Sequence, residues 1–181
     1  MAALATFFAV TWLVFWAYWT LSAVGAKRGS HHGLATRVPF IVTAALVVVL
    51  LRGARAGSLE VHSLVLRCVG VVLFLAGLAL AVWARLNLGR NWGMPMTRKD
   101  EPELVTSGPY RLVRHPIYSG VLLAVLGTAL ATTLYWLVAL VILGAYFLFS
   151  ARVEERMLEG EFPDAYPGYR AHTKMLIPFL L

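Results

Sequence analysis

The chain has 181 residues, of which 60% are hydrophobic and only 14% charged, and its formal net charge is +7. A soluble domain carries about 25% charged residues, whereas four stretches of this chain contain no Asp, Glu, Lys or Arg, namely 1–26, 38–51, 68–84 and 115–151. This pattern excludes a soluble globular protein, and the length excludes a large separate catalytic domain. The basic residues fall between the apolar runs rather than on one compact face, which argues against nucleic-acid binding.

The first half of the chain predicts three transmembrane helices. A membrane span needs about 20 apolar residues, and segments 2–24 and 64–84 have this length and composition. Segment 34–51 reaches the same length if the side chain of Arg37 extends to the membrane interface.

The run 115–151 is too long for a single span. As one straight helix it would extend roughly 55 Å, well beyond a hydrocarbon core of about 30 Å. We therefore expect a reversal near 131–133, which gives a helical hairpin over 116–150 and about five spans in total. The sequence predicts an all-α polytopic membrane protein with one integral membrane domain over 1–181.

The distribution of charge predicts the orientation of these spans. With the 85–114 loop and the C-terminal tail in the cytoplasm, 13 Lys and Arg residues lie inside and three lie outside. The opposite orientation would reverse this bias and violate the positive-inside rule. The N-terminus is therefore expected outside, and the C-terminal tail inside.

Polar residues concentrate in 86–118 and 152–174, and the hairpin brings both segments to the same membrane face. Gly108-Pro109 predicts a turn. Pro116 suits the first position of a helix, and His115 before it is held away from helical geometry. The free amides at this helix start would favour an anion. Small residues then follow on one helix face, permitting close approach of a second helix: Gly120, Ala124 and Gly127.

Residues 104–120 read LVTSGPYRLVRHPIYSG, and they are followed by Glu154-Glu155-x-x-Leu158 and by Phe162-x3-Tyr166-x2-Tyr169. This combination resembles the signature of the isoprenylcysteine carboxyl methyltransferase family, which is related to the phospholipid methyltransferases. The resemblance covers about 86–181, whereas the spans within 1–84 match only as apolar helices. LGRNW at 88–92 is similar to the segment that precedes the signature in bacterial members, which implies a bacterial inner-membrane protein. The charge bias then predicts an active site that faces the cytoplasm.

The resemblance implies a methyltransferase that uses S-adenosylmethionine in a pocket built by membrane helices. The absence of a glycine-rich βαβ fingerprint in the sequence agrees with such a pocket. The implied cofactor-binding residues are Pro102, Glu103, Leu104, Val105, Tyr110, His115, Pro116, Ile117, Tyr118 and Glu154. Arg111 and Arg114 are further candidates for the carboxylate of the cofactor.

The substrate end departs from the family pattern. Animal members have a substrate-binding arginine where this chain has Ser150, and Arg152 is the nearest replacement. We expect Arg152 to hold a substrate carboxylate, with Glu155 as an electrostatic partner. Two residues correspond to about 200° of helix rotation, so this role requires a helix break near Ala151 or a long reach.

The leading functional hypothesis is O-methylation of a carboxylate on an isoprenoid or prenyl-cysteine-like lipophilic substrate. Phospholipid N-methylation is an alternative from the same superfamily, and a non-catalytic membrane protein of the same fold is another. Plainer interpretations also stand: solvated helix charges for Glu154 and Glu155, topology charges for Arg111 and Arg114, and a helix cap for His115. The other histidines have no ligand spacing, so we predict no metal site.

Overall fold

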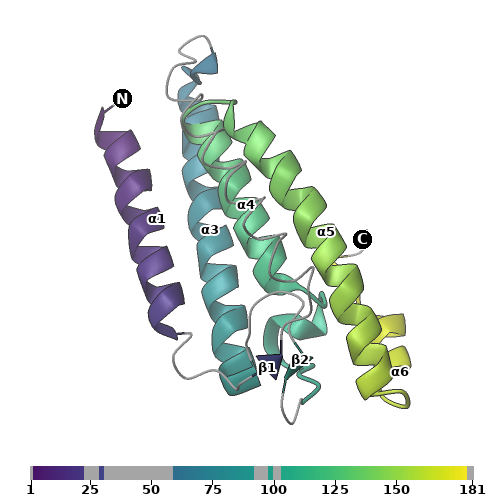
Figure 1. Cartoon of the computed structure of the whole chain (residues 1–181). Coiled ribbons are helices and arrows are strands. Elements are labelled where there is room, and N and C mark those ends of the chain that lie inside the picture. Colours follow the sequence, from purple (N-terminus) through teal and green to yellow (C-terminus); the bar gives the residue numbers. More distant parts are fainter. Residues whose placement is uncertain (1, 23–28, 31–58, 92–97, 100–102, 179–181) are drawn as a thin grey trace.

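Four long helices stand side by side in the computed structural model, which describes residues 2–22, 29–30, 59–91, 98–99 and 103–178. In Figure 1, α4 lies between α3 and α5, and α1 lies beside α3. The helices are α1 (Ala2–Ser22), α3 (Leu64–Leu88), α4 (Pro116–Ala131), α5 (Trp136–Glu161) and the short α6 (Tyr166–His172). Two 3-10 turns, η3 (Gly89–Asn91) and η4 (Gly108–Arg111), follow α3 and precede α4.

Within the described ranges, the named strands are limited to β1 (Gly29–Ser30) and β2 (Arg98–Lys99). They pair antiparallel, with Gly29 opposite Lys99 and Ser30 opposite Arg98. Apart from this strand pair and the connecting turns, the described residues are helical, which confirms the predicted all-α class.

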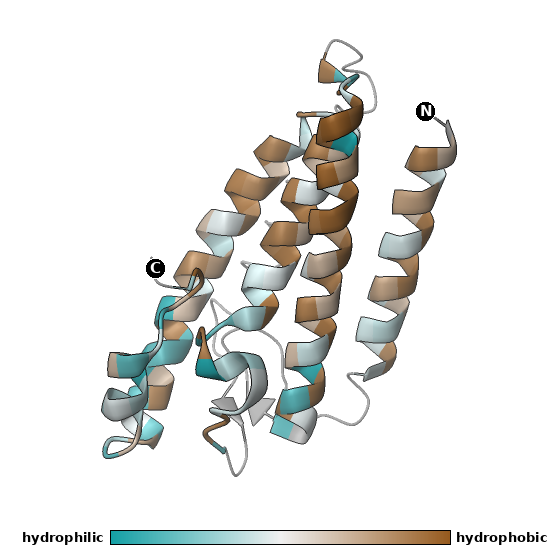
Figure 2. Ribbon diagram, turned by 180° about the vertical axis from the view of Figure 1, so that it is seen from behind, coloured by the Kyte–Doolittle hydropathy of each residue, from teal (hydrophilic) through white to brown (hydrophobic). Residues whose placement is uncertain are grey.

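Helices α1, α3 and α5 are long and apolar enough to cross a membrane, whereas α4 has 16 residues. Large apolar side chains face outward along them; Leu13, Val65 and Val141 are each about 70% exposed. Figure 2 shows that brown, hydrophobic ribbon fills most of these helices and that teal, hydrophilic ribbon gathers at one end of the bundle. The chain is thus an integral membrane protein. The expected span at 34–51 lies outside the described residues, so the number five stays a prediction.

Two glycines on α3 and two on α4 bring these helices into backbone contact. A Cβ added at Gly77 would lie 2.5 Å from the Ala124 nitrogen and the Gly120 oxygen, and one added at Gly127 would lie 2.4 Å from the Phe74 nitrogen. The small-residue face predicted on α4 therefore packs against α3, as close approach of membrane helices requires.

The predicted hairpin between α4 and α5 is confirmed. Helix α4 ends at Ala131, and Thr132 donates its backbone N–H to the Thr128 oxygen as the helix cap. The turn is held from outside, because the Val61 N–H donates to the Thr132 oxygen and the Leu134 N–H donates to the Leu59 oxygen, both at 3.0 Å. The turn contains neither glycine nor proline, and these backbone bonds hold the chain at the reversal.

The C-terminal segment crosses the start of α4 at the polar end of the bundle. The N–H groups of Arg114 and His115 donate to the backbone oxygens of Lys174 and Met175, at 2.8 and 3.0 Å. The Ser119 hydroxyl donates to the Leu176 oxygen at 2.5 Å, and Leu176 is buried in the apolar core. This segment therefore fixes the residues around Pro116 against α5 and α6.

Candidate active site

His115 lies at the start of α4, where the sequence predicts a break from helical geometry. Its φ and ψ are −124° and 59°, and Pro116 occupies the first helical turn. Because proline has no N–H, it costs nothing at this position, and it disfavours helical geometry at His115. The side chain of His115 is 6% exposed and lies between α4 and α5.

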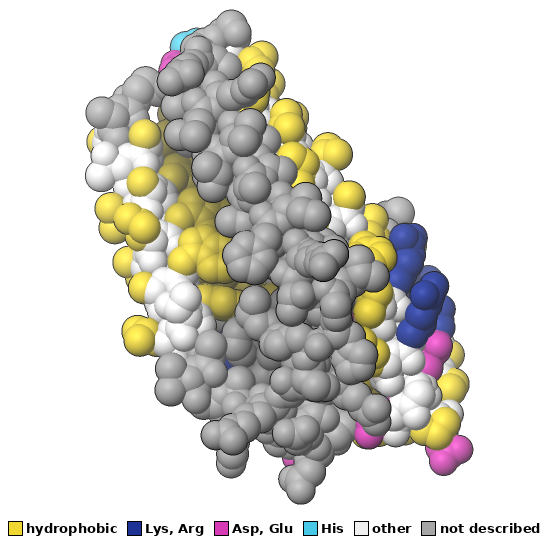
Figure 3. All heavy atoms as spheres, viewed as in Figure 1, with side chains coloured by type: hydrophobic (Ala, Val, Ile, Leu, Met, Phe, Trp, Pro, Cys, Tyr) yellow, Lys and Arg dark blue, Asp and Glu magenta, His cyan; other side chains and the backbone are white. Residues whose placement is uncertain are grey.

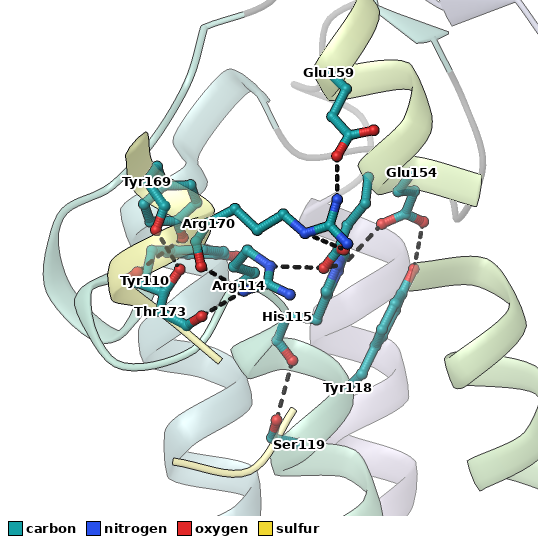
Figure 4. A network of polar contacts seen from close by, with 11 residues as sticks. Tyr110, Arg114, His115, Tyr118, Ser119, Glu154, Glu159, Tyr169, Arg170 and Thr173 are labelled. Atoms are coloured by element: carbon teal, nitrogen blue, oxygen red, sulfur yellow. Dashed lines mark hydrogen bonds and ion pairs between the residues drawn. The ribbon is translucent and has the colours of Figure 1, made fainter. Parts of the chain in front are cut away.

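Glu154 on α5 is held by two side chains from the α4 start (Figure 4). The Tyr118 hydroxyl donates to Oε1 of Glu154 at 2.5 Å, and His115 Nδ1 lies 3.5 Å from Oε2. The Glu154 side chain is 24% exposed, more than either partner. Its carboxylate is thus fixed in position, while the side chain as a whole remains partly exposed.

The neighbouring Glu155 points into the protein instead. Its side chain is 5% exposed, and its Oε1 accepts a hydrogen bond from Arg114 Nε at 2.7 Å and lies 3.4 Å from His115 Nε2. Arg114 also donates to the backbone oxygen of Thr173 at 2.5 Å. Arg114 therefore ties the loop before α4, helix α5 and the C-terminal segment together.

Electrostatics favour the protonated form of His115. Burial of the ring favours the neutral form, but contacts with Glu154 and Glu155 outweigh it and raise the pKa of His115 above its usual value. With its proton, the imidazole carries a charge that offsets one of the two carboxylates, and Arg114 offsets the other.

Aromatic rings continue the cluster toward the apolar core. The ring of Tyr118 stacks on His115 at 5.4 Å between centroids and on Phe147 at 4.4 Å, with interplanar angles of 3° and 5°. Tyr146, the neighbour of Phe147 on α5, is partly buried. These contacts fix the Tyr118 ring, and hence the hydroxyl that holds Glu154.

Two tyrosines of α6 lie near the same polar cluster. The Tyr169 hydroxyl donates to the backbone oxygen of Tyr110 at 2.8 Å, and Tyr166 is fully buried. Burial, together with the nearby Tyr169 and Glu154, raises the pKa of Tyr110, and burial raises the pKa of Tyr169 to about 12. These tyrosines are neutral hydrogen-bonding groups at neutral pH.

The structure brings together five of the implied cofactor residues around the α4 start: Tyr110, His115, Pro116, Tyr118 and Glu154. Ile117 follows Pro116 in the first turn of α4 and packs against the apolar core. Glu103 instead accepts a hydrogen bond from Asn91 Nδ2 at 2.9 Å, and Leu104 and Val105 are partly buried beside it in sequence. Pro102 lies outside the described residues.

The role predicted for Arg152 requires either a helix break near Ala151 or a long reach of its side chain, and α5 has no break there. Helix α5 runs without interruption from Trp136 to Glu161, and Arg152 is exposed on it, whereas Ser150 is buried. A regular helix turns these two positions to opposite sides. Helix continuity therefore leaves only the long reach of the Arg152 side chain, and its role at a substrate stays a prediction.

Sequence reasoning missed the structural roles of Arg114, Phe147 and Thr173. The sequence indicates only a cofactor contact or a topology charge for Arg114, yet in the structure Arg114 is half of a buried ion pair. Arg111, in contrast, is exposed. No sequence spacing connects 114 with 155 and 173, since these contacts depend on how the hairpin and the tail pack.

A family model described as phospholipid methyltransferase matches residues 65–165. The chain belongs to this family. The match includes α3, α4 and α5, and with them the whole His115–Glu154–Glu155 arrangement.

Curated relatives differ in their names. The cobalt-zinc-cadmium resistance protein CzcN of Cupriavidus metallidurans is 33% identical over 113 residues, which are 61% of this chain and 50% of that protein. The probable protein-S-isoprenylcysteine O-methyltransferase of Oryza sativa subsp. indica is 30% identical over 116 residues, 62% of this chain and 61% of that protein. The chain thus matches between half and three fifths of the length of these relatives.

Among solved structures, the chain is similar to the eukaryotic intramembrane Ras methyltransferase, isoprenylcysteine carboxyl methyltransferase. The TM-score is 0.58 at 28% sequence identity, and the match covers 64% of this chain and 43% of that protein. The membrane fold suggested by the sequence resemblance is therefore shared with this enzyme.

Proposed function

We propose that this chain is an S-adenosylmethionine-dependent membrane methyltransferase, which methylates a carboxylate on an isoprenoid or prenyl-cysteine-like lipophilic substrate. The observation that carries the proposal is a buried polar cluster at one end of an apolar bundle, in which Tyr118 and His115 hold the partly exposed carboxylate of Glu154. Membership of the phospholipid methyltransferase family supports methyl transfer.

The residues present suit S-adenosylmethionine, which when bound would supply an electrophilic methyl group on a sulfonium sulfur. Glu154 offers an anionic acceptor for a hydroxyl or cationic group of the cofactor. The first-turn amides after Pro116 have no acceptor within the helix and suit its carboxylate. Tyr118 would act by holding Glu154, because its hydroxyl is bonded to that carboxylate and its ring stacks on His115 and Phe147.

The depth of the cluster supports a lipophilic acceptor. Helix α4 has 16 residues and spans about 24 Å, less than a hydrocarbon core of about 30 Å. Because hydrophilic residues gather at this end of the bundle (Figure 2), we place the α4 start near the membrane boundary, where a substrate dissolved in the bilayer and a cofactor from the cytoplasm meet. We assign this end of the bundle to the cytoplasmic side of a bacterial inner membrane, as the charge bias predicts.

Catalysis in this proposal depends on alignment of the acceptor oxygen with the methyl carbon for in-line displacement. Holding two reactants in this geometry removes much of the entropic barrier. The described residues contribute a rigid frame, since the Arg114–Glu155 ion pair and the Tyr118 stack fix Glu154 and the first turn of α4.

Phospholipid N-methylation is the alternative that a specific observation favours. An amine acceptor is cationic before it loses its proton, and the partly exposed carboxylate here is Glu154, whereas Glu155 is already paired with Arg114. The description of the matching family model favours the same class of acceptor.

Transfer of labelled methyl from S-adenosylmethionine into membrane lipids, followed by alkali, tests both acceptors. Methyl esters release volatile methanol, whereas N-methyl products retain the label. We expect release of methanol from the wild type, and background label from Glu154→Gln. Label that survives alkali would support N-methylation, and absence of transfer in the folded wild type would overturn methyltransferase activity.

A further inference from the structure

His115 lies between two carboxylates. Its Nδ1 is 3.5 Å from Glu154 Oε2, and its Nε2 is 3.4 Å from Glu155 Oε1. Nε2 is buried without a hydrogen bond of normal geometry, and the whole side chain is 6% exposed. Both ring nitrogens thus face glutamates, so His115 is poorly placed to contact a ligand directly.

Charged and titratable groups surround this ring from every neighbouring element. They are Glu154 and Glu155 on α5, Arg114 in the preceding loop, Tyr118 on α4, Tyr110 in η4, and Tyr166, Tyr169 and Arg170 on α6. Arg170 Nε lies 4.0 Å from Glu155 Oε2, but Arg170 is 51% exposed and is also paired with Glu159, so it contributes weakly at the ring. The inner set therefore consists of two carboxylates, one guanidinium and one imidazole. The net charge of this set is zero only when His115 carries its proton.

We propose that His115 is a positioning residue whose proton competes with a cationic ligand group at Glu154, so that binding of the ligand expels the proton. The inference rests on the proposed function, in which this ligand is S-adenosylmethionine. Glu154 connects the two events, because the same carboxylate faces His115 at Oε2 and is the partly exposed acid of the cluster.

Repulsion between like charges supplies the coupling. Two unit charges about 6 Å apart, at the effective dielectric of a protein, change a proton affinity on the order of a hundredfold. A cation on Glu154 then replaces the imidazolium as the counter-charge, and the proton leaves to solvent. Because linkage is reciprocal, loss of the proton must strengthen binding of the cation.

The sign of the pH dependence follows directly. The contacts with both glutamates raise the pKa of the free protein's His115 despite its burial. The ligand affinity should therefore rise with pH while His115 is protonated, by up to about tenfold per pH unit if a full proton is released.

Calorimetric titration of the full chain in detergent, in two buffers of different ionisation enthalpy, measures protons released on binding. The ligand pair is S-adenosylmethionine and S-adenosylhomocysteine, which differ in the sulfonium charge. The pH is kept below about 6.7, a full unit under the pKa of about 7.7 of an α-amino group, so that the amino group of either ligand remains protonated. We expect release on the order of one proton with the sulfonium ligand and clearly less with the neutral sulfide.

His115→Gln and His172→Gln form a matched pair. His172 is exposed on α6, and its Nδ1 lies 2.8 Å from its own helix at the Gly168 oxygen, so it has no part in the cluster. Proton release should vanish in His115→Gln and persist in His172→Gln, whereas a merely structural role of His115 would lower affinity without changing its pH dependence.

The outcomes separate the two proposals. Failure of the folded wild type to bind either ligand would overturn the proposed function. Binding without proton release, or equal release by His115→Gln, would overturn the role of His115 alone. If His115→Gln does not fold, the wild type still decides, since an affinity that is flat or falls with rising pH contradicts the inference.

Discussion

Adjacent glutamates on α5 have different environments. Successive helical residues are rotated by about 100°, so Glu155 faces Arg114 in the interior while Glu154 lies at the partly exposed edge. The inner carboxylate is neutralised by a hydrogen-bonded guanidinium at 2.7 Å and serves structure. The outer carboxylate is positioned by Tyr118 and His115 and is the one suited to a ligand.

Replacing Glu154 by Gln should weaken binding of S-adenosylmethionine. A hydrogen bond to a charged group contributes about 1.5–3 kcal/mol, which corresponds to a roughly 10–150-fold loss of affinity. Calorimetry in detergent measures it, with Glu159→Gln as the control, because Glu159 is paired with Arg170 on the exposed side. Equal affinities of wild type and Glu154→Gln would remove Glu154 from the binding site.

At the scale of elements, Arg114 joins three segments that are distant in sequence. It pairs with Glu155 on α5, donates to the Thr173 oxygen after α6, and lies directly before the start of α4. The pair is buried on both sides, at 9% and 5% exposure. Such a pair is costly to break, because the remaining charge keeps its desolvation penalty.

Arg114→Gln should destabilise the protein by about 3–5 kcal/mol. Thermal unfolding in detergent measures the loss. Arg111→Gln is the matched control, since Arg111 is exposed three residues earlier, and its effect should stay within about 0.5 kcal/mol. Similar melting temperatures for both variants would show that the ion pair does not hold the segments together.

The α3–α4 interface depends on the absence of side chains. Gly77→Ala would place a Cβ 2.5 Å from backbone atoms of Gly120 and Ala124, which cannot move aside as a flexible side chain can. We expect destabilisation of about 1–3 kcal/mol, as for other overpacked cores. Gly144→Ala on α5 meets nothing within 4 Å and should be neutral or slightly stabilising, by up to about 1 kcal/mol. Equal melting temperatures of the two variants would contradict the close approach.

For the whole molecule, the polar end of the bundle and the positive charges coincide. Figure 3 shows basic side chains in dark blue beside the yellow, apolar stretch of α5, and the two arginines of this helix, Arg152 and Arg156, are both exposed. An exposed arginine at a membrane boundary favours the cytoplasmic side, in agreement with the predicted orientation.

A topology reporter fused after Lys174 should be cytoplasmic, and one fused at the N-terminus should be extracytoplasmic. The physical reason is the asymmetry of 13 Lys and Arg residues inside against three outside. Alkaline phosphatase and fluorescent-protein fusions at both positions measure it. Both termini on one side of the membrane would contradict an odd number of spans.

The sequence by itself determined the membrane class, the helix that starts at Pro116, the reversal after Ala131 and the small-residue face of α4. These features depend on local chemistry: apolar run length, the missing N–H of proline and the small volume of glycine. Only the tertiary structure decided that Glu155 is buried against Arg114, that Arg152 faces outward and that His115 lies between two glutamates. Those outcomes depend on helix rotation and on contacts between residues 39 to 59 positions apart, which local patterns do not encode.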